Sequence, residues 1–275
     1  FYHCFGCGAH GTVVGFLMQY DKLSYPEAIE ELAGRLGLDV PREGGDAGNQ
    51  APRVDASAFE LMASVAKYFS DALARDSRAN EYVTKRGLTK DIIERFGIGY
   101  APNSWNDVLR RFGRNEAGVQ QLAELGLIIE RERGQIRDGE RHYDRFRDRV
   151  MFPIRDARGR VIAFGGRIID QGEPKYLNSP ETILFHKGRE LYGLYEARQS
   201  RVSLKRLVVV EGYMDTVRLH QYGISYAVAT LGTATTPEHL KRVFRLVSEV
   251  VFAFDGDRPG RAAGWRALQQ ALPEA

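Results

Sequence analysis

Val208-Val-Val-Glu-Gly-Tyr-Met-Asp215 and Val250-Val-Phe-Ala-Phe-Asp-Gly-Asp257 share one pattern near the end of the chain. In both, a run of β-branched and aromatic residues stops at an acidic residue and a glycine, and a helical pattern follows. A continuous apolar run is typical of a strand buried in a parallel sheet. Ligands of open α/β sheets bind beyond the carboxyl ends of such strands. We therefore expect an α/β fold with acidic residues gathered at one edge of a sheet.

The residues from Arg206 onward repeat a strand–helix rhythm. Strands are predicted over 206–210, 226–230 and 249–254, and helices over 213–222, 237–247 and 258–271. Thr236 and Pro237 suit the cap and the first turn of the second helix. Alternation at this spacing predicts right-handed βαβ units around a parallel sheet.

Upstream of this rhythm, the pattern mixes helices with an antiparallel hairpin. Apolar spacing predicts helical packing from Asp55 to about residue 124. Two runs rich in apolar residues, 150–155 and 161–169, predict a hairpin. Gly165-Gly166 in the second run predicts a bulge or the close approach of another backbone. Residues 172–178 are polar and are predicted to form a loop.

Four acidic residues follow the predicted strand ends. Glu211 ends the first strand, and Asp255 and Asp257 end the third; Asp215 lies one helical turn after Glu211. A single acid at such a place is more often a helix cap. Acids at neighbouring strand ends repel one another and need a cation, and their oxygens are ligands that Mg²⁺ prefers. The pattern predicts a metal-dependent phosphoryl-transfer site, with backbone N–H groups near Gly232 available to a phosphate.

The composition is that of an ordinary soluble globular protein, with 43% hydrophobic and 27% charged residues. No apolar run reaches the roughly 20 residues of a membrane helix, and no signal peptide is recognisable. Two cysteines are too few for a disulfide scaffold and favour a reducing cytoplasm. The net charge is only +3, but residues 131–170 hold eleven arginines against seven acidic residues. Such a cluster suits phosphate recognition, although a solvated charged surface explains it equally well.

Cys4 and Cys7 form a Cys-x-x-Cys turn flanked by aromatic residues and glycines. Two thiolates at this spacing can hold one Zn²⁺, and a structural zinc site needs four ligands. His3 and His10 are local candidates for the remaining ligands, and a second pair could precede Phe1. A redox role would require a preceding thioredoxin-like strand, which the sequence does not show. Zinc binding is therefore the favoured interpretation.

The sequence predicts four regions. Residues 1–40 form a zinc-binding module, 41–53 a linker rich in glycine, proline and polar residues, 54–203 a mixed core, and 204–275 the parallel sheet. The chain begins without Met and stops just after a helical run, so we expect it to be a fragment of a longer protein. In the polar loop, Lys175, Tyr176 and Asn178 could hold a nucleotide's phosphates and base, but a surface loop with a packed tyrosine is also compatible.

Several strings resemble the bacterial DNA primases of the DnaG type. Glu211-Gly-Tyr-Met-Asp215 with Asp255-Gly-Asp257 resembles the Toprim domain of primases, topoisomerases and some nucleases. Tyr2-His-Cys-Phe-Gly-Cys-Gly8 resembles the second ligand pair of the primase zinc ribbon. Four further strings resemble the primase polymerase core. They are Arg149-Val-Met-Phe-Pro-Ile, Phe164-Gly-Gly-Arg167, Lys175-Tyr-Leu-Asn178-Ser-Pro-Glu-Thr, and Phe185-His-Lys-Gly-Arg189-x-Leu-Tyr-Gly. The resemblance runs from Phe1 to about Ala275.

The resemblance implies a DNA-directed RNA polymerase that makes short RNA primers on single-stranded DNA by two-metal phosphoryl transfer. Its fold would combine a zinc-ribbon remnant, a mixed helical and β subdomain, and a Rossmann-like Toprim sheet. By family pattern, Glu211, Asp255 and Asp257 hold Mg²⁺ or Mn²⁺ with Asp215 supporting, and Cys4 and Cys7 bind Zn²⁺. Residues implied in binding nucleotides or nucleic acid are Arg86, Arg145, Arg147, Arg149, Arg167, Lys175, Tyr176 and Asn178.

The resemblance also implies partners and missing parts. NTPs, the DNA template and the RNA primer would be the ligands, and a replicative helicase would bind a C-terminal domain beyond Ala275. The family's first zinc pair would precede Phe1, and a further acidic pair would follow Ala275. Two alternatives stay open: a Toprim nuclease or topoisomerase, which would need a tyrosine nucleophile elsewhere, and an inactive fragment that binds single-stranded DNA.

Overall fold

The computed structural model describes residues 1–20, 25, 28–29, 32–33, 56–131, 141–200, 204–232 and 234–273. The chain divides into two compact units, Phe1–Arg53 and Val54–Ala275. The predicted linker over 41–53 lies outside the described residues. Residues 54–203 and 204–275 belong to one compact unit, and the predicted boundary between them stays a prediction.

The first unit begins with a small antiparallel ribbon. Strand β1 (Tyr2–His3) pairs with β2 (His10–Gly11), and helix α1 (Val13–Tyr20) follows. The two cysteines lie in the turn that joins the strands. The Thr12 hydroxyl accepts the Gly15 N–H at 3.0 Å, so it satisfies one of the first free donors of α1.

The first half of the second unit is mainly helical. Its helices are α3 (Ala56–Arg75), α4 (Ser77–Lys85), α5 (Lys90–Phe96), α6 (Asp107–Phe112) and α7 (Glu116–Glu124). Asp76 caps α4 by accepting the Ala79 N–H at 2.8 Å. Gly97 ends α5 with a φ of 64°, a conformation that glycine adopts without strain. The helical packing predicted for this region is confirmed.

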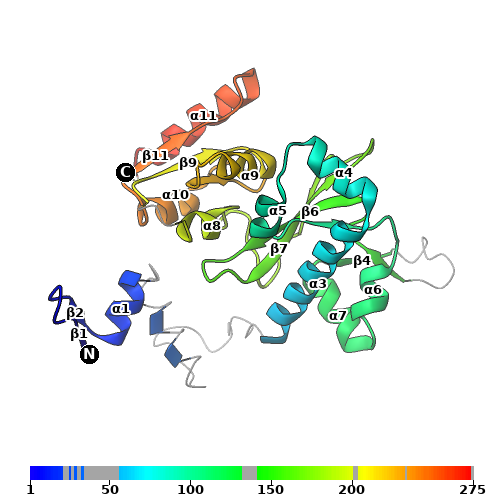
Figure 1. The fold of residues 1–275 in the computed structure, drawn as a ribbon, viewed down its shortest axis with the longest axis horizontal. Coiled ribbons are helices and arrows are strands. Elements are labelled where there is room, and N and C mark those ends of the chain that lie inside the picture. The colour runs from blue at the N-terminus through cyan, green and yellow to red at the C-terminus, as the bar shows by residue number, and fades with distance from the viewer. Residues whose placement is uncertain are drawn as a thin grey trace. The chain divides into compact units, whose positions relative to one another are not determined.

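An antiparallel sheet packs against α3 (Figure 1). Its strand order is β3 (Gly99–Ala101), β6 (Arg149–Arg155), β7 (Val161–Ile168) and β8 (Tyr176–Asn178). A separate ribbon joins β4 (Ile128–Glu130) to β5 (His142–Asp144). The predicted hairpin is confirmed as β6 and β7.

Two local predictions in this sheet are wrong. Residues 176–178 are strand β8 rather than loop, because they pair with β7 from Gly165↔Asn178 to Arg167↔Tyr176. The double glycine marks neither a bulge nor an approaching backbone: the register shift lies at Ile154 and Arg155. A Cβ on Gly165 would fall 2.4 Å from the Tyr213 ring, so the glycine leaves room for the side chain of Tyr213.

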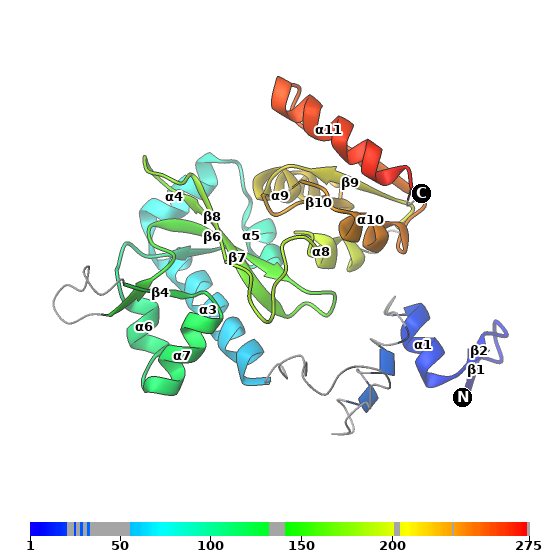
Figure 2. The same ribbon diagram turned by 180° about the vertical axis from the view of Figure 1, so that it is seen from behind.

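The predicted parallel sheet is confirmed. Strand β9 (Arg206–Val210) lies between β10 (Ala227–Ala229) and β11 (Glu249–Phe252), and both pairings are parallel. The intervening helices are α9 (Tyr213–Gln221), α10 (Pro237–Phe244) and α11 (Arg258–Ala271), with α8 (Leu194–Arg198) leading in. Figures 1 and 2 both show α11 on the side of this layer away from the antiparallel sheet.

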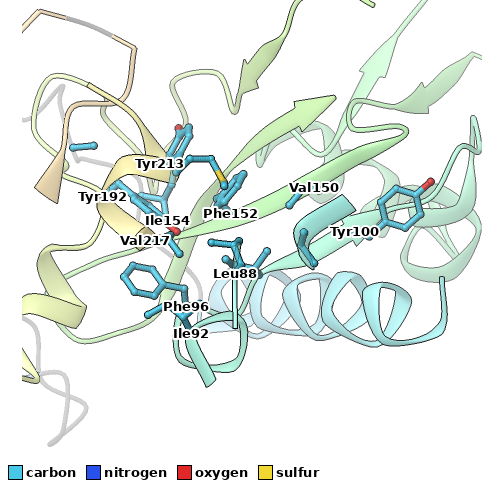
Figure 3. Packing of buried hydrophobic residues seen from close by; sticks show 14 of the residues in the cluster. Leu88, Ile92, Phe96, Tyr100, Val150, Phe152, Ile154, Tyr192, Tyr213 and Val217 are labelled. Carbon is cyan, nitrogen blue, oxygen red and sulfur yellow. The ribbon is translucent and has the colours of Figure 1, made fainter. Parts of the chain in front are cut away.

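One hydrophobic cluster joins the two sheets of the second unit. Phe96, Phe152, Tyr192, Tyr213 and Val217 belong to it and are almost fully buried. The rings of Phe152 and Tyr213 stack with centroids 5.3 Å apart (Figure 3). Strand β6 and helix α9 therefore share one core, which fixes the ends of β9 relative to the antiparallel sheet. In the part of the chain that the structure describes, no helix is long and apolar enough to cross a membrane.

Candidate active site and nucleic-acid interface

The acidic residues lie where the parallel strands end. Glu211 directly follows β9, and Asp255 follows its neighbour β11 by three residues. The backbone N–H of Asp255 donates to Oε1 of Glu211 at 3.1 Å, so the two strand ends are joined. The prediction that Glu211 and Asp255 come from neighbouring strand ends therefore agrees with the strand order.

Asp257 serves first as a helix cap. Its Oδ1 accepts the Gly260 N–H at 2.8 Å at the start of α11. Asp257 and Glu211 also line a cavity of about 330 Å³, together with Thr230 and Arg266. The capping role noted for a lone acid thus holds here, and the other carboxylate oxygen is left for the cavity.

Asp215 lies in the first turn of α9. Its pKa is raised above the usual value, because partial burial and the nearby Asp255 carboxylate both disfavour the charged form. No ion pair among the described residues neutralises Glu211, Asp215, Asp255 or Asp257. The same described residues contain no group of three or more His, Cys, Asp or Glu arranged to hold a metal ion. The donor set, exposed carboxylates that form no ion pair within the described ranges, still fits a hard divalent cation.

Strand β8 bonds to both neighbouring strand ends of the parallel sheet. The Tyr213 hydroxyl donates to Oδ1 of Asn178 at 2.7 Å, and Nδ2 of Asn178 donates to the Leu231 carbonyl at 2.8 Å. Tyr213 lies two residues after Glu211, and Leu231 two residues after β10. The predicted Asn178 site is thereby fixed beside the predicted acidic site.

Arg167 and Arg86 are linked through Tyr82. Nε of Arg167 donates to the Tyr82 hydroxyl at 2.8 Å, and another nitrogen of the same guanidinium donates to the Tyr176 hydroxyl. The Arg86 guanidinium lies over the Tyr82 ring, 5.2 Å from its centroid. Tyr176 is 39% exposed and packs against Arg167 and Tyr213, so the alternative of a packed tyrosine stays open for its side chain. The backbone carbonyl of Lys175 accepts a hydrogen bond from Arg149.

Arg149 and Arg145 are held by backbone carbonyls. Arg149 is buried and donates to the Gly166 and Lys175 carbonyls at 3.5 and 3.4 Å, and burial lowers its pKa. Arg145 donates to the Asn178 carbonyl at 3.2 and 3.0 Å, and burial lowers its pKa as well. Both remain charged at neutral pH, because an arginine pKa starts far above 7.

A platform of two aromatic rings and two arginines was not predicted. Trp105 and Tyr143 have centroids 5.6 Å apart. Arg147 lies over both rings, at 4.2 Å and 5.1 Å, and Arg131 lies over them at 5.4 Å and 4.9 Å. Trp105 is 53% exposed. Aromatic residues interleaved with arginines around 141–147 were the available signal, but Trp105 is distant in sequence.

The cysteine turn has the geometry of a metal-binding knuckle. Both thiols are exposed. The backbone N–H groups of Cys7 and Gly6 point at the Cys4 sulfur and lower its pKa, which favours the thiolate that binds zinc. Nδ1 of His10 lies 3.1 Å from the Gly8 carbonyl, so that this nitrogen is engaged with the turn itself. The residues present fit Zn²⁺ as a pair of ligands.

Three family models match consecutive parts of the chain. The CHC2 zinc finger matches residues 1–47, the DNA primase catalytic core N-terminal domain matches 68–198, and the Toprim domain matches 205–275. The DNA primases of Haemophilus influenzae and Escherichia coli K12 are each 52% identical over 99% of this chain. The chain belongs to the bacterial DNA primases of the DnaG type.

Solved primase structures share the fold. A DnaG primase catalytic domain bound to single-stranded DNA is 51% identical, with a TM-score of 0.74 over 79% of this chain and 67% of that one. The Aquifex aeolicus primase, comprising zinc-binding and RNA polymerase domains, is 34% identical, with a TM-score of 0.71 over 99% of this chain and 64% of that one.

The chain spans about half the length of the curated primases that it matches. It covers 46% of the Haemophilus influenzae and Escherichia coli proteins. The zinc-ribbon and Toprim families both imply metal ions, Zn²⁺ in the first unit and Mg²⁺ in the second.

Proposed function

We propose that this chain carries the centre of a DNA-directed RNA polymerase that makes short RNA primers on single-stranded DNA. The observation that carries the proposal is the bonding of Asn178 to Tyr213 and Leu231. It fixes the arginine-rich antiparallel sheet against the acidic strand ends. A polymerase needs both halves together, because an anionic nucleotide must be held beside a metal-binding site.

The acidic strand ends supply the metal site in this proposal. Glu211, Asp255 and Asp257 would hold Mg²⁺ or Mn²⁺, and Asp215 would support them from the first turn of α9. When bound, such ions lower the pKa of the attacking 3′-hydroxyl and neutralise the charge that develops on the phosphoryl group. The link from the Asp255 N–H to Glu211 keeps the two strand ends adjacent without using the second oxygen of Glu211.

The arginines and β8 supply the nucleotide and strand sites. Arg167, Lys175 and Asn178 would bind the triphosphate of the incoming NTP or the product strand. The 3′-oxygen of the primer attacks the α-phosphorus, the bond to the β-phosphate oxygen breaks, and pyrophosphate leaves. Arg86 and Arg149 would add positive charge beside this path. Planar guanidinium groups suit phosphate oxygens because they donate in pairs.

The Trp105–Tyr143 platform would hold the template. Exposed aromatic rings stack on the bases of single-stranded nucleic acid without regard to sequence, and neighbouring arginines attract its phosphates. Arg145 and Arg147 continue from the platform toward Asn178. The related catalytic domain solved with single-stranded DNA is compatible with this assignment.

Cys4 and Cys7 would bind zinc in a module that helps to select the start site. Zinc per chain, measured by atomic emission, should fall in Cys4→Ser, and an unchanged zinc content would remove this assignment. Helicase contact would lie in parts of the longer primases that this chain does not cover, and the enzyme would work at the replication fork in the cytoplasm.

Primer synthesis on single-stranded DNA with NTPs and Mg²⁺ tests the proposal, for residues 1–275 and for the full-length protein that contains them. Asp255→Ala should reduce synthesis at least about a hundredfold, whereas Glu60→Gln, a loss of one exposed charge on α3, should not. Full activity in Asp255→Ala contradicts the proposal.

Two other outcomes would favour the alternative functions. DNA cleavage without NTPs would favour a Toprim nuclease or topoisomerase, and salt-sensitive binding without synthesis by the full-length protein would favour a binding role alone.

A further inference from the structure

The segment 144–149, here called the arginine segment, contains one strained residue. Asp148 has a φ of 51°, and among the described residues no other non-glycine residue has a positive φ. Side chains with a Cβ rarely adopt this conformation, and it persists where the surroundings hold it in place. Asp148 lies between Arg147 and Arg149, so its conformation decides where those two side chains go.

The Asp148 side chain is held by two residues from outside the segment. The Tyr100 hydroxyl, from β3, donates to Oδ1 of Asp148 at 2.8 Å. The Arg78 guanidinium, from α4, forms an ion pair with the same oxygen and donates to the Tyr100 hydroxyl at 3.0 Å. Its other terminal nitrogen pairs with Asp170. In Figure 3, Tyr100 lies at one end of the buried cluster with its hydroxyl pointing away from the other labelled side chains.

The Asp148 backbone is held on both sides as well. Its N–H donates to the Pro102 carbonyl at 3.3 Å, and its carbonyl accepts the Ile169 N–H at 3.4 Å. Side chain and backbone together make the strained conformation over-determined, which is the condition under which strain persists at working sites.

The side chains of the two arginines next to Asp148 lie in different places. Arg147 lies over the Trp105 ring, 4.2 Å from its centroid, on the exposed platform. Arg149 is buried and donates to the Gly166 and Lys175 carbonyls. The turn at Asp148 separates a guanidinium on the template platform from one behind the nucleotide-binding strand.

We propose that Arg78, Tyr100 and Asp148 form a positioning cluster that sets Arg147 on the platform for binding single-stranded template. The proposal rests on the proposed function, because it takes the platform as the template site. The three residues act through Arg147 and do not themselves contact the nucleic acid. An acid next to a phosphate-binding arginine opposes DNA binding by its charge, and Arg78 neutralises that acid while fixing it.

Asp148→Gly is the sharpest test, because charge and positioning predict opposite outcomes. Glycine adopts a φ of 51° freely, so the variant removes the carboxylate without adding backbone strain. Loss of one negative charge alone should tighten DNA binding. The positioning cluster instead predicts that the dissociation constant for labelled oligo(dT), measured by anisotropy, rises about three- to tenfold, as for a lost cation–π contact.

Matched controls separate charge from position. Asp170→Asn removes the other acid beside Arg78 and should not weaken binding. Arg78→Met should weaken binding more than Lys90→Met, which removes one exposed positive charge from α5. Thermal unfolding of each variant shows that it is folded.

A second readout needs no DNA. The sequence has two tryptophans, so in a Trp265→Phe background Trp105 is the only tryptophan, and its emission is excited at wavelengths that tyrosine does not absorb. Asp148→Gly should make Trp105 more accessible to acrylamide, since Arg147 leaves its ring. Unchanged quenching with unchanged or tighter oligo(dT) binding overturns the cluster. If the parent chain does not bind oligo(dT), the proposed template site is wrong. In that case the acrylamide quenching of Trp105 alone decides whether the cluster positions Arg147.

Discussion

The arginine segment and the acidic strand ends differ in how they are held by the rest of the chain. Arg145 and Arg149 donate to carbonyls of the antiparallel sheet, and Arg147 lies on aromatic rings. Glu211 and Asp255 share one backbone hydrogen bond and have no ion-pair partner among the described residues. A guanidinium can be satisfied by carbonyls and π faces of its own chain, whereas neighbouring carboxylates repel one another. In the proposed site, folding alone therefore organises the cationic half, whereas the anionic half would depend on cations from outside.

Asp144 and Asp255 give the largest contrast between the two regions. Asp144 is the first residue of the arginine segment; it is buried and accepts the Val108 and Leu109 N–H groups, at 2.7 and 3.0 Å, at the start of α6. Asp144→Ala leaves both donors without an acceptor and should lower the free energy of unfolding by about 2–3 kcal/mol. Asp255→Ala should change it by less than about 0.5 kcal/mol.

Urea denaturation followed by circular dichroism measures both changes. Comparable destabilisation by the two variants would abolish the contrast, since it would mean that the acidic strand ends are as tightly held as the arginine segment. Burial raises the pKa of Asp144 above its usual value, so part of its carboxylate's stabilisation is offset by desolvation. Asp144→Asn, which keeps the shape, should therefore cost less than Asp144→Ala.

The placement of Glu211 and Asp255 at neighbouring strand ends was predictable because its signals are local. An apolar run, a carboxylate and a glycine lie in consecutive residues, and the rules of parallel sheets bring the ends of β9 and β11 together. The order β10-β9-β11 agrees with that expectation. The capping of α11 by Asp257 was also readable from position alone.

The basic half was harder because its contacts are distant in sequence. Strand β8 is polar and follows Gly172 and Pro174, so it was predicted as a loop, but pairing with β7 overrides local preference. Trp105 meets Tyr143 because the Asp144 N–H donates to the Trp105 carbonyl at 2.7 Å. The room beside Gly165 is filled by Tyr213, the first residue of α9. No pattern in consecutive residues predicts contacts between segments that are this far apart in the sequence.

His220 extends the comparison from the edge of the parallel sheet to its packed interior. It is buried behind β10, lies edge-on to Phe96 and bonds to the Ala227 carbonyl at 2.8 Å. Burial lowers its pKa to about 4. Between pH 6.5 and 4 this histidine is protonated in the unfolded chain but stays neutral in the folded chain. The free energy of unfolding therefore falls as the pH falls through this window.

The expected loss for His220 is about 2 kcal/mol at pH 5 relative to pH 8. His220→Gln, whose amide can still donate to the Ala227 carbonyl, should remove that part of the pH dependence. Denaturation midpoints at several pH values between 4 and 8 measure it. If the parent and His220→Gln lose stability in parallel, then His220 is not held neutral and the body of the sheet is less rigid than its packing indicates.

Trp105 tests the preorganised side directly, with the smallest expected change in free energy. Trp105→Ala removes both a stacking surface and the support of Arg147, so affinity for single-stranded DNA should fall about tenfold, near 1.4 kcal/mol. The slope of log affinity against log salt should stay nearly the same, because every positive charge is retained, whereas Arg147→Met should reduce that slope by about 0.7. Tyr222→Ala removes another exposed ring, 71% accessible, at the end of α9 and serves as the control. Equal losses in Trp105→Ala and Tyr222→Ala would mean that the platform is ordinary surface, and the arginine segment would then be organised for the stability of the fold rather than for a template.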